Sequence, residues 1–393
     1  MKRLSYNKFL RKQNDVGEFE YFVEHTKNYS GLTELLDSFL ENGCKYENLP
    51  ISELDNNTSL ILSVSVIDMD SENYLDNLKT YLKLNCKNTF IELSCHDHQE
   101  VDNSFYEFCR SESKNQLYFI DKNMLHISDD ILFFEHHCWH TSMYIPKYKN
   151  EFDKLNKWSQ KFKKQKKGLF LAGHIRFHKL ELLNFLYEQG VLDKDFIWSS
   201  TDATFQPDLF QEFIPDRDLE TYNNFKILER IPHFQDFDLY DHWKYHNYPA
   251  HVNFMNYFNT YFEVVPETQF YDRINLSGTK STRQDWVSIS EKTCKAIRVD
   301  IPFVMVSKAN TTKLLIDRFG FDFELGFWNF DYDKIENNND RMQLIKDRLT
   351  KILSLTDNEL HDFYYEYINV KKNNDIFIQN FYIEPLFKIW NKL

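Results

Sequence analysis

Apolar runs and helical segments alternate along the first third of the chain. Strand-like apolar runs occupy 59–70, 88–100 and 115–123, and segments with helical apolar spacing lie between them at 73–84 and 104–111. This alternation predicts a parallel, doubly wound sheet, because parallel strands need a crossover segment between them. The strand-like runs end in polar residues, and the ends of such strands are where α/β proteins bind ligands.

A second series of strands and helices follows. We expect a strand at 168–173, a helix from Arg176 to Tyr187 that is closed by Gly190, and another strand within 196–205. The other expected elements are a helix at 32–40, a helix that begins at 311 and stops at Gly320, a short strand after it at 321–323, one long amphipathic helix through the 340s and 350s, and a terminal helix at 377–393.

The segment 261–303 gathers polar groups at a junction between a strand and a helix. Two apolar runs flank its polar loop, and the second of them, continuing over 301–306, predicts a buried strand. Ser290 is expected to cap a helix that begins directly after it. Helix starts of this kind bind phosphates and nucleotides in α/β proteins. The polar residues placed there are Glu267, Thr268, Ser290, Glu291 and Lys292.

A basic cluster stands at the start of the helix expected after the strand at 168–173. It consists of Arg176, His178 and Lys179. Cations at a helix N-terminus oppose the helix dipole and reduce stability, so they are easier to explain if an anion lies between them and the helix end. The alternative is ordinary surface charge.

The chain of 393 residues is too long for one ordinary core, and two domains are expected. The charged segment 145–168 is the candidate boundary. We therefore divide the chain into residues 1–155, residues 156–375 and residues 376–393, the last of which forms a helix that packs on the body. The net charge of −13 argues against a generally basic nucleic-acid-binding surface.

The cysteines and the N-terminus indicate an intracellular protein. Six Cys are scattered without the spacing of a disulfide framework, which favours reduced thiols. The first residues lack the apolar core of a signal peptide, and no apolar run approaches the ~20 residues of a membrane span. We expect a cytoplasmic location.

The segment 168–350 resembles the nucleotide-binding half of glycosyltransferases with the glycosyltransferase-B architecture, and it is most similar to the family 10 fucosyltransferases and related viral and bacteriophage proteins. That family has Glu-Asn-Ser/Thr at a strand end, then Thr-Glu-Lys at a helix start, then a strand beginning near Val-Pro. The matching pieces here are Pro266-Glu267-Thr268, Ser290-Glu291-Lys292 and Ile301-Pro302-Phe303. Phe319-Gly320-Phe321, Asp331-Tyr332-Asp333 and Arg341 resemble the viral relatives.

The resemblance implies an α/β protein with two Rossmann-like domains and a cleft between them, in which residues 1–155 would bind the acceptor and residues 156–375 the nucleotide sugar. If the protein is viral, as those relatives are, its expected location is the host cytoplasm. It implies transfer of a sugar from a nucleotide-diphosphate donor to an acceptor hydroxyl, inverting and metal-independent, with no bound cofactor. Asn is missing after Glu267 and Ser290 stands in place of Thr, so fucose specificity is not carried over.

Each polar group has an expected role in such a transfer. Lys292 and Arg176, with His178 and Lys179 beside them, would neutralise the diphosphate. Glu291 would bind the ribose diol, and Glu267 would orient the sugar or Lys292. An inverting transfer also needs a general base, which this fold takes from the first domain. The candidates are Asp97, which we prefer, Glu100 and Glu135.

Two kinds of metal site are alternatives. Asp68 and Asp70 follow an apolar strand, like the metal-binding Asp-X-Asp of the single-domain glycosyltransferases, although 236–238 and 331–333 match that pattern as well. The cysteines and histidines within 95–98 and 136–140 are the right residue types for zinc but lack the usual finger spacing.

The sequence does not identify the acceptor. A glycan is the family default, and a hydroxymethylated base of phage DNA is the other candidate. For DNA, the lysine-rich run 161–167 would contact phosphates, and Tyr240, Trp243 and Tyr245 would stack on a flipped base. The run is otherwise a solvated face, and the aromatics otherwise pack a long insertion. A non-catalytic nucleotide- or sugar-binding protein of the same fold is the alternative function.

Overall fold

A computed structural model describes the chain in two compact units, Met1–Trp139 with Phe381–Leu393, and His140–Asn380. The expected domain limits at 155/156 and 375/376 stay predictions. The residues that it describes are 3–9, 45–46, 58–65, 72–94, 103–121, 127–133, 161–172, 176–200, 224–231, 233, 254–267, 270–271, 287, 289–371, 373–377, 379–380 and 384–392. The helix expected at 32–40 lies outside them.

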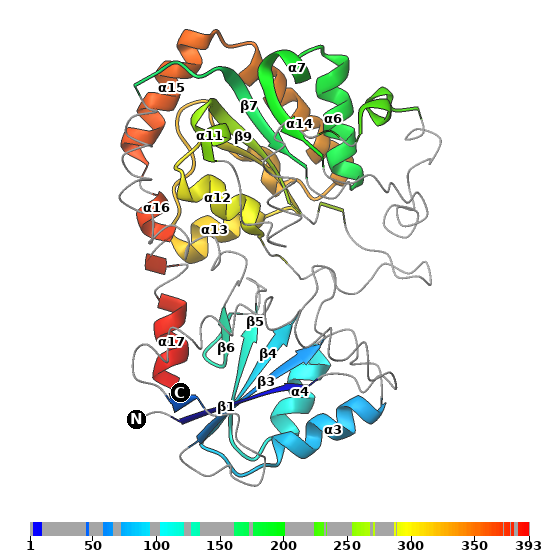
Figure 1. Ribbon diagram of the computed structural model, residues 1–393, viewed down its shortest axis with the longest axis vertical. Coiled ribbons are helices and arrows are strands. Elements are labelled where there is room, and N and C mark those ends of the chain that lie inside the picture. Colours follow the sequence, from blue (N-terminus) through cyan, green and yellow to red (C-terminus); the bar gives the residue numbers. More distant parts are fainter. Residues whose placement is uncertain are drawn as a thin grey trace. The chain divides into compact units, whose positions relative to one another are not determined.

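The first unit contains a parallel six-stranded sheet, so the α/β prediction is confirmed. Helices α3 (Glu72–Leu82) and α4 (Asn103–Glu112) connect successive strands, as the apolar spacing predicted, and lie beside each other in Figure 1. The strand order is β2 (Lys45–Tyr46), β1 (Arg3–Phe9), β3 (Thr58–Ser65), β4 (Asn88–Ser94), β5 (Gln116–Asp121) and β6 (Ile131–Phe133).

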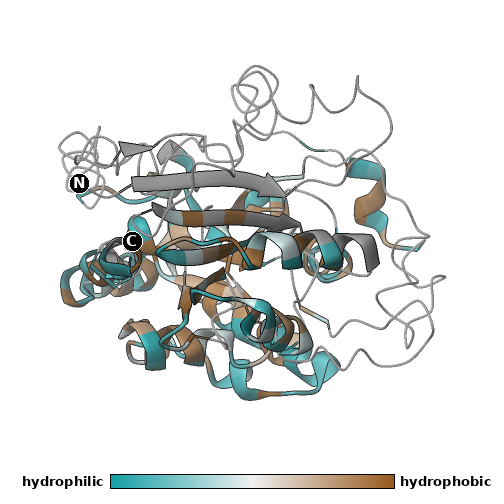
Figure 2. Ribbon diagram, turned by 90° about the horizontal axis from the view of Figure 1, so that it is seen from below, coloured by the Kyte–Doolittle hydropathy of each residue, from teal (hydrophilic) through white to brown (hydrophobic). Residues whose placement is uncertain are grey.

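The core of this unit lies between the sheet and its two helices. Leu60 and Leu62 from β3, and Leu78 and Leu82 from α3, are completely buried. Figure 2 shows that the coloured parts of the strands are largely hydrophobic, whereas the helices alternate between hydrophobic and hydrophilic turns. This is the pattern of helices that cover a sheet with one face and meet water with the other.

The second unit contains a parallel four-stranded sheet with the order β10-β9-β7-β8. β7 begins at Lys166, two residues earlier than expected, so part of the lysine-rich run belongs to a strand. Gly168 in β7 leaves room for the ring of Phe196 on β8. The strands are β7 (Lys166–Leu171), β8 (Phe196–Ser199), β9 (Thr260–Pro266) and β10 (Phe303–Val306).

Helices surround this second sheet. Gly190 and Gly320 adopt positive φ angles after α6 and α13, as the expected helix ends require. The helices are α6 (Phe177–Glu188), α7 (Leu192–Asp195), α11 (Phe254–Phe258), α12 (Glu291–Arg298), α13 (Thr311–Phe319), α14 (Asn338–Leu353), α15 (Asp357–Val370) and α16 (Asn373–Ile376), with single 3-10 turns η3 (Lys226–Arg230) and η4 (Asp331–Lys334).

Two expectations for the C-terminal part were wrong. The one long helix is two, because Thr356 and Glu359 form a capping box that starts α15. The strand expected at 321–323 is absent from these described residues, and its rings pack instead, with Phe321 stacked on Phe323. The terminal helix expected at 377–393 is confirmed in part, because residues 377, 379 and 380 are helical and α17 spans Glu384–Lys392. α17 belongs to the first unit, where Asn88 donates to the main-chain oxygen of Lys392.

The sequence predicted that the cysteine thiols are all reduced, and the structure differs from that prediction. Cys86 and Cys109 are free and buried, whereas Cys294 on α12 is disulfide-bonded. Among the helices in the described ranges, none has both the length and the apolar character that a membrane crossing requires.

Candidate functional site

The order of the strands in the second sheet marks one position for a ligand. The chain passes from β7 to β8 in one direction and from β9 to β10 in the other, so the order reverses between β7 and β9. Right-handed crossovers then place α6 and α12 on opposite faces of the sheet, with their starts at the carboxyl ends of these two neighbouring strands (Figure 1). Ligands of open α/β sheets bind at this kind of reversal.

The start of α6 brings the expected basic cluster to that edge. Arg176 occupies the N-cap position with extended backbone and is partly exposed. His178 and Lys179 are each only 2% exposed. The three residues therefore lie together, but only Arg176 presents its side chain in part to solvent.

His178 links the starts of the two helices. Its Nε2 lies 2.8 Å from the main-chain oxygen of Glu267 at the end of β9. Because a carbonyl oxygen only accepts, Nε2 carries the proton and donates it. Burial, together with the positive charges of Lys179, Arg176 and Lys292, holds the pKa of His178 well below its ordinary value, and the bond to Glu267 opposes that shift. His178 is thus neutral, whereas the sequence suggested a cation.

The side chain of Glu267 closes the start of α12. Its Oε1 accepts a hydrogen bond of 3.0 Å from the main-chain N–H of Ser290 and a second one from the hydroxyl of Thr293. Ser290 is the N-cap, as expected, and its hydroxyl accepts from the main-chain N–H of Lys292. The Nζ of Lys292 lies 3.2 Å from the same hydroxyl, so Lys292 is held at this helix start.

Arg341, in the first turn of α14, clamps the loops behind the site. Its guanidinium donates to the main-chain oxygens of Ser307, Ile335, Glu336 and Phe270 and to Oδ1 of Asn338. All five N–H groups of the guanidinium therefore have an acceptor. The ring of Phe270 lies 4.5 Å beneath the guanidinium and stacks on His178. Arg341 is thus a structural residue that supports His178 through Phe270.

The other expected acidic pair at 331–333 has a structural role as well. The Oδ2 of Asp333 accepts from the main-chain N–H of Lys313 in the first turn of α13, at 3.0 Å. Burial raises the pKa of Asp333 to about 6, against these main-chain hydrogen bonds and the charge of Arg341. Asp331 instead pairs with Lys334 on the surface. Asp333 therefore binds the start of α13, and Asp331 lies in a surface ion pair.

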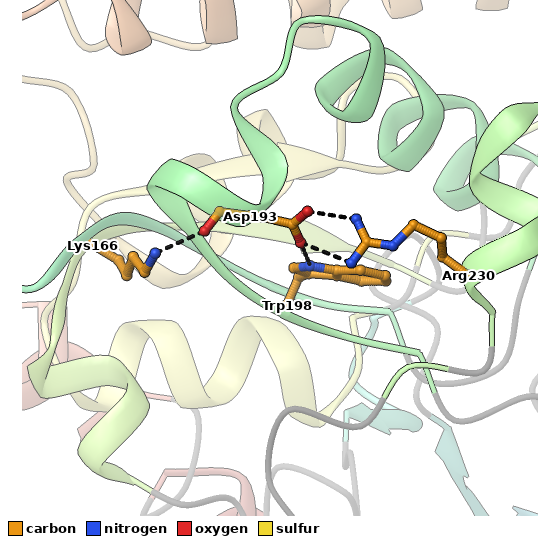
Figure 3. A network of polar contacts seen from close by, with 4 residues as sticks. All are labelled: Lys166, Asp193, Trp198 and Arg230. Carbon is orange, nitrogen blue, oxygen red and sulfur yellow. Dashed lines mark hydrogen bonds and ion pairs between the residues drawn. The ribbon is translucent and has the colours of Figure 1, made fainter.

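Lysines of the lysine-rich run make hydrogen bonds within the second unit. Lys166 donates to the main-chain oxygens of Asp193 and Lys194, and Figure 3 shows Arg230 and Trp198 holding the carboxylate of Asp193 from the other side. Lys167 donates to the main-chain oxygens of Leu353 and Leu355 at the end of α14.

Two more lysines of this run also have partners. Lys163 donates to the side-chain oxygen of Asn358, and the amine of Lys164 lies 4.5 Å from the ring centre of Tyr364. The run is therefore neither a simple solvated face nor a set of four amines available to a polyanion.

Several expected residues lie outside the described part of the chain. These are Thr268, the side chain of Glu291, the base candidates Asp97, Glu100 and Glu135, the pair Asp68 and Asp70, the cysteine and histidine clusters within 95–98 and 136–140, and the aromatics Tyr240, Trp243 and Tyr245. Within the residues that are described, no group of three or more His, Cys, Asp or Glu is placed to hold a metal ion.

Two site residues were not recognised in the sequence. Thr293 lies three residues after the N-cap, where a hydroxyl reaches the group that caps the helix. Glu263 lies inside the apolar run of β9 and is 1% exposed. A carboxylate in an otherwise apolar strand was the signal that this buried position has a special environment.

Comparisons with protein-family models, with curated proteins and with solved structures give no match for this chain. The resemblance to the glycosyltransferases therefore stays an expectation from the sequence, which rests on residues 266–268, 290–292 and 301–303 and on 319–321, 331–333 and Arg341.

Proposed function

We propose that this protein is a glycosyltransferase that moves a sugar from a nucleotide-diphosphate donor to an acceptor hydroxyl without a metal. One observation carries this proposal. His178, between Arg176 and Lys179 at the start of α6, donates at 2.8 Å to the main-chain oxygen of Glu267. The side chain of Glu267 binds Ser290, whose hydroxyl lies 3.2 Å from the Nζ of Lys292, so the cations of the two helix starts are held at one edge of the sheet. Three cations gathered where the strand order reverses favour an anionic ligand.

A diphosphate suits this place better than a single carboxylate. The two helix starts come from neighbouring strands, and each offers one partly exposed cation, Arg176 on α6 and Lys292 on α12. The first turn of α6 carries no acidic residue, whereas Glu267 and Asp333 bind at the starts of α12 and α13. We assign the diphosphate to Arg176, Lys292 and the start of α6.

The remaining parts of the mechanism belong to the same proposal. Glu267 orients Lys292 through Ser290, since the hydroxyl of Ser290 contacts the amine while its N–H binds the carboxylate. Glu291 binds the ribose, and Asp97 or Glu135 removes the acceptor proton. The two-domain, glycosyltransferase-B organisation is part of the proposal. The lysine run gives a DNA acceptor no support, so a glycan is preferred.

The first test is ligand binding. A thermal-shift series with nucleoside diphosphates and nucleotide sugars should raise the melting temperature, because a ligand that binds only the folded state stabilises it. Lys292→Met and Arg176→Gln should each lose most of the shift. Lys161→Gln, an exposed change in the lysine run, should keep it. No shift with any nucleotide would contradict the proposal.

Turnover separates the enzyme from a binding protein of the same fold. Release of the nucleoside diphosphate from a bound nucleotide sugar, accelerated by an acceptor glycan, is the expected result. Binding without turnover across a panel of donors and acceptors would favour the non-catalytic alternative.

A further inference from the structure

A second carboxyl group lies beneath the candidate site. Glu263 lies on β9, and Glu267 directly follows that strand, four residues later. In an extended segment this spacing places both side chains on the same face, towards α12, where Thr293 donates to Glu267. The Oε1 of Glu263 accepts a hydrogen bond of 3.3 Å from the hydroxyl of Tyr257 on α11. Its Oε2 is buried and has no hydrogen-bond partner within the described part of the chain. An ionised carboxylate in this position is poorly compensated.

The charges around Glu263 come mainly from α12. Lys292 and Lys295 are three residues apart and share one face of that helix, and both favour the ionised carboxylate. Lys295 is only 4% exposed. Burial outweighs both lysines and raises the pKa of Glu263 to about 8, and the charge of Glu267 adds to this rise.

The other elements packed on Glu263 are mostly uncharged. Phe303 of β10 and Leu169 of β7 are its neighbours in the sheet. α15 packs on the same strand face through Tyr364 and His361, which contact Tyr261. The lysines of α12 are therefore the cations whose field at Glu263 a ligand beside Lys292 would change.

We infer that an anion bound beside Lys292 makes Glu263 take up a proton, so that Glu263 balances the charge of the occupied site. The inference rests on the proposed function, because it requires an anion at that place. Negative charge beside Lys292 cancels part of the field that stabilises ionised Glu263. The proton comes from the buffer and forms an O–H bond at the Glu263 carboxylate. By linkage, anion affinity then falls as the pH rises through the range in which Glu263 ionises.

Calorimetric titration measures this coupling. Uridine diphosphate, and guanosine diphosphate where the uridine compound does not bind, is titrated at pH 8 in buffers with different ionisation enthalpies. The slope of the observed heat against buffer enthalpy gives the protons taken up. We expect up to about half a proton for the unaltered protein, because a group with a pKa near 8 is half-protonated there.

Three variants identify the group. Glu263→Gln mimics the protonated acid and should bind without that proton uptake. Tyr257→Phe removes a hydrogen bond that favours the ionised form, so maximal uptake should move to higher pH. Glu366→Gln, the same change at an exposed position of α15, should behave like the unaltered protein.

The outcomes separate the coupling from the function on which it rests. If neither nucleotide binds, the anion site itself is wrong and the coupling falls with it. If a nucleotide binds with no proton uptake, or if Glu263→Gln takes up as many protons as the unaltered protein, the coupling is wrong and the anion site stands.

Discussion

The Nε2 of His178 lies 2.8 Å from the main-chain oxygen of Glu267, and this hydrogen bond joins the starts of α6 and α12 across the end of the sheet. The main chain of Glu267 is held from α6, while its side chain is held by Ser290 and Thr293 of the α12 start. If one helix start is displaced, Glu267 therefore passes the displacement to the other helix start.

Replacement of His178 by Phe tests this link. Phe keeps the ring that stacks on Phe270 but removes the donor to Glu267. A buried carbonyl without its donor costs about 1 to 3 kcal/mol of unfolding free energy. Urea unfolding measures the loss, and nucleotide affinity should fall with it. An unchanged affinity would mean that the bond does not position the site.

The same variant has a pH signature. The folded pKa of His178 lies below its unfolded value, so the unfolded chain binds protons more readily once the pH falls below about 6.5. The contribution is present above that pH and is lost as the pH falls towards the folded pKa. Unfolding free energy measured from pH 7 down to about pH 5 should decline less steeply in His178→Phe.

Glu263 should give the opposite dependence. Its folded pKa of about 8 lies above the unfolded value, so its contribution is present below about pH 4.5 and is lost as the pH rises through 8. Glu263→Gln should match the unaltered protein near pH 5 and exceed its stability above pH 8, on the order of 2 to 4 kcal/mol. Equal stability of the two proteins at high pH would show that burial does not raise the pKa of Glu263.

The lysine run offers a matched pair of variants. Lys167 donates to two main-chain oxygens at the end of α14, whereas Lys161 is exposed. Lys167→Met should lower the unfolding free energy by about 1 to 2 kcal/mol, and Lys161→Met should change it by less than about 0.5 kcal/mol. Chemical denaturation of both variants is the measurement. Equal losses of unfolding free energy in the two variants would contradict the role of Lys167 in binding the last carbonyl oxygens of α14.

Arg341→Lys separates charge from hydrogen-bond number. Lysine keeps the positive charge but has three donors instead of five, so at least two of the five acceptors lose their partner. We expect a loss of about 3 kcal/mol or more, because several buried groups are affected together. A loss under 1 kcal/mol would mean that the hydrogen bonds from Arg341 to main-chain oxygens contribute little to the free energy of unfolding.

Gly168→Ala tests the packing between β7 and β8. A Cβ at this position would lie 2.3 Å from Cε1 of Phe196, whose ring is fully buried. Overpacking of this kind costs about 1 to 3 kcal/mol. Adding Phe196→Leu should restore part of the stability, and a double-mutant cycle measures that coupling. Independent, additive losses would argue against the contact.

The sequence predicted well those elements whose apolar pattern is strong. β3, β4, β5 and α3 follow continuous or helical apolar spacing and were placed correctly. β1 was missed, because Arg3–Phe9 mixes charged and apolar residues without the continuous run that central strands usually have. The break between α14 and α15 was missed because it depends on a capping box, which the longer helical pattern obscured.

Part of the site was predictable because it depends on residues that are close together in the sequence. Ser290 as a helix cap follows from local chemistry, and the gathering of basic residues at Arg176 is visible in the sequence. The neutral state of His178 and the engagement of Lys166 and Lys167 depend on partners far along the chain, which spacing does not reveal. The position of Glu263 beneath α12 follows from the register of the sheet, which sequence spacing does not reveal.

The strand order also determines how the second unit assembles in time. β7 pairs with β8 and β9 pairs with β10 over short stretches of sequence, whereas Lys166 of β7 pairs with Thr260 of β9, 94 residues later (260 − 166). Closing a loop of that length costs on the order of 4 kcal/mol in chain entropy. We expect two local halves to form early and to dock late, so that the junction of His178 with Glu267 matures in the slowest phase of refolding.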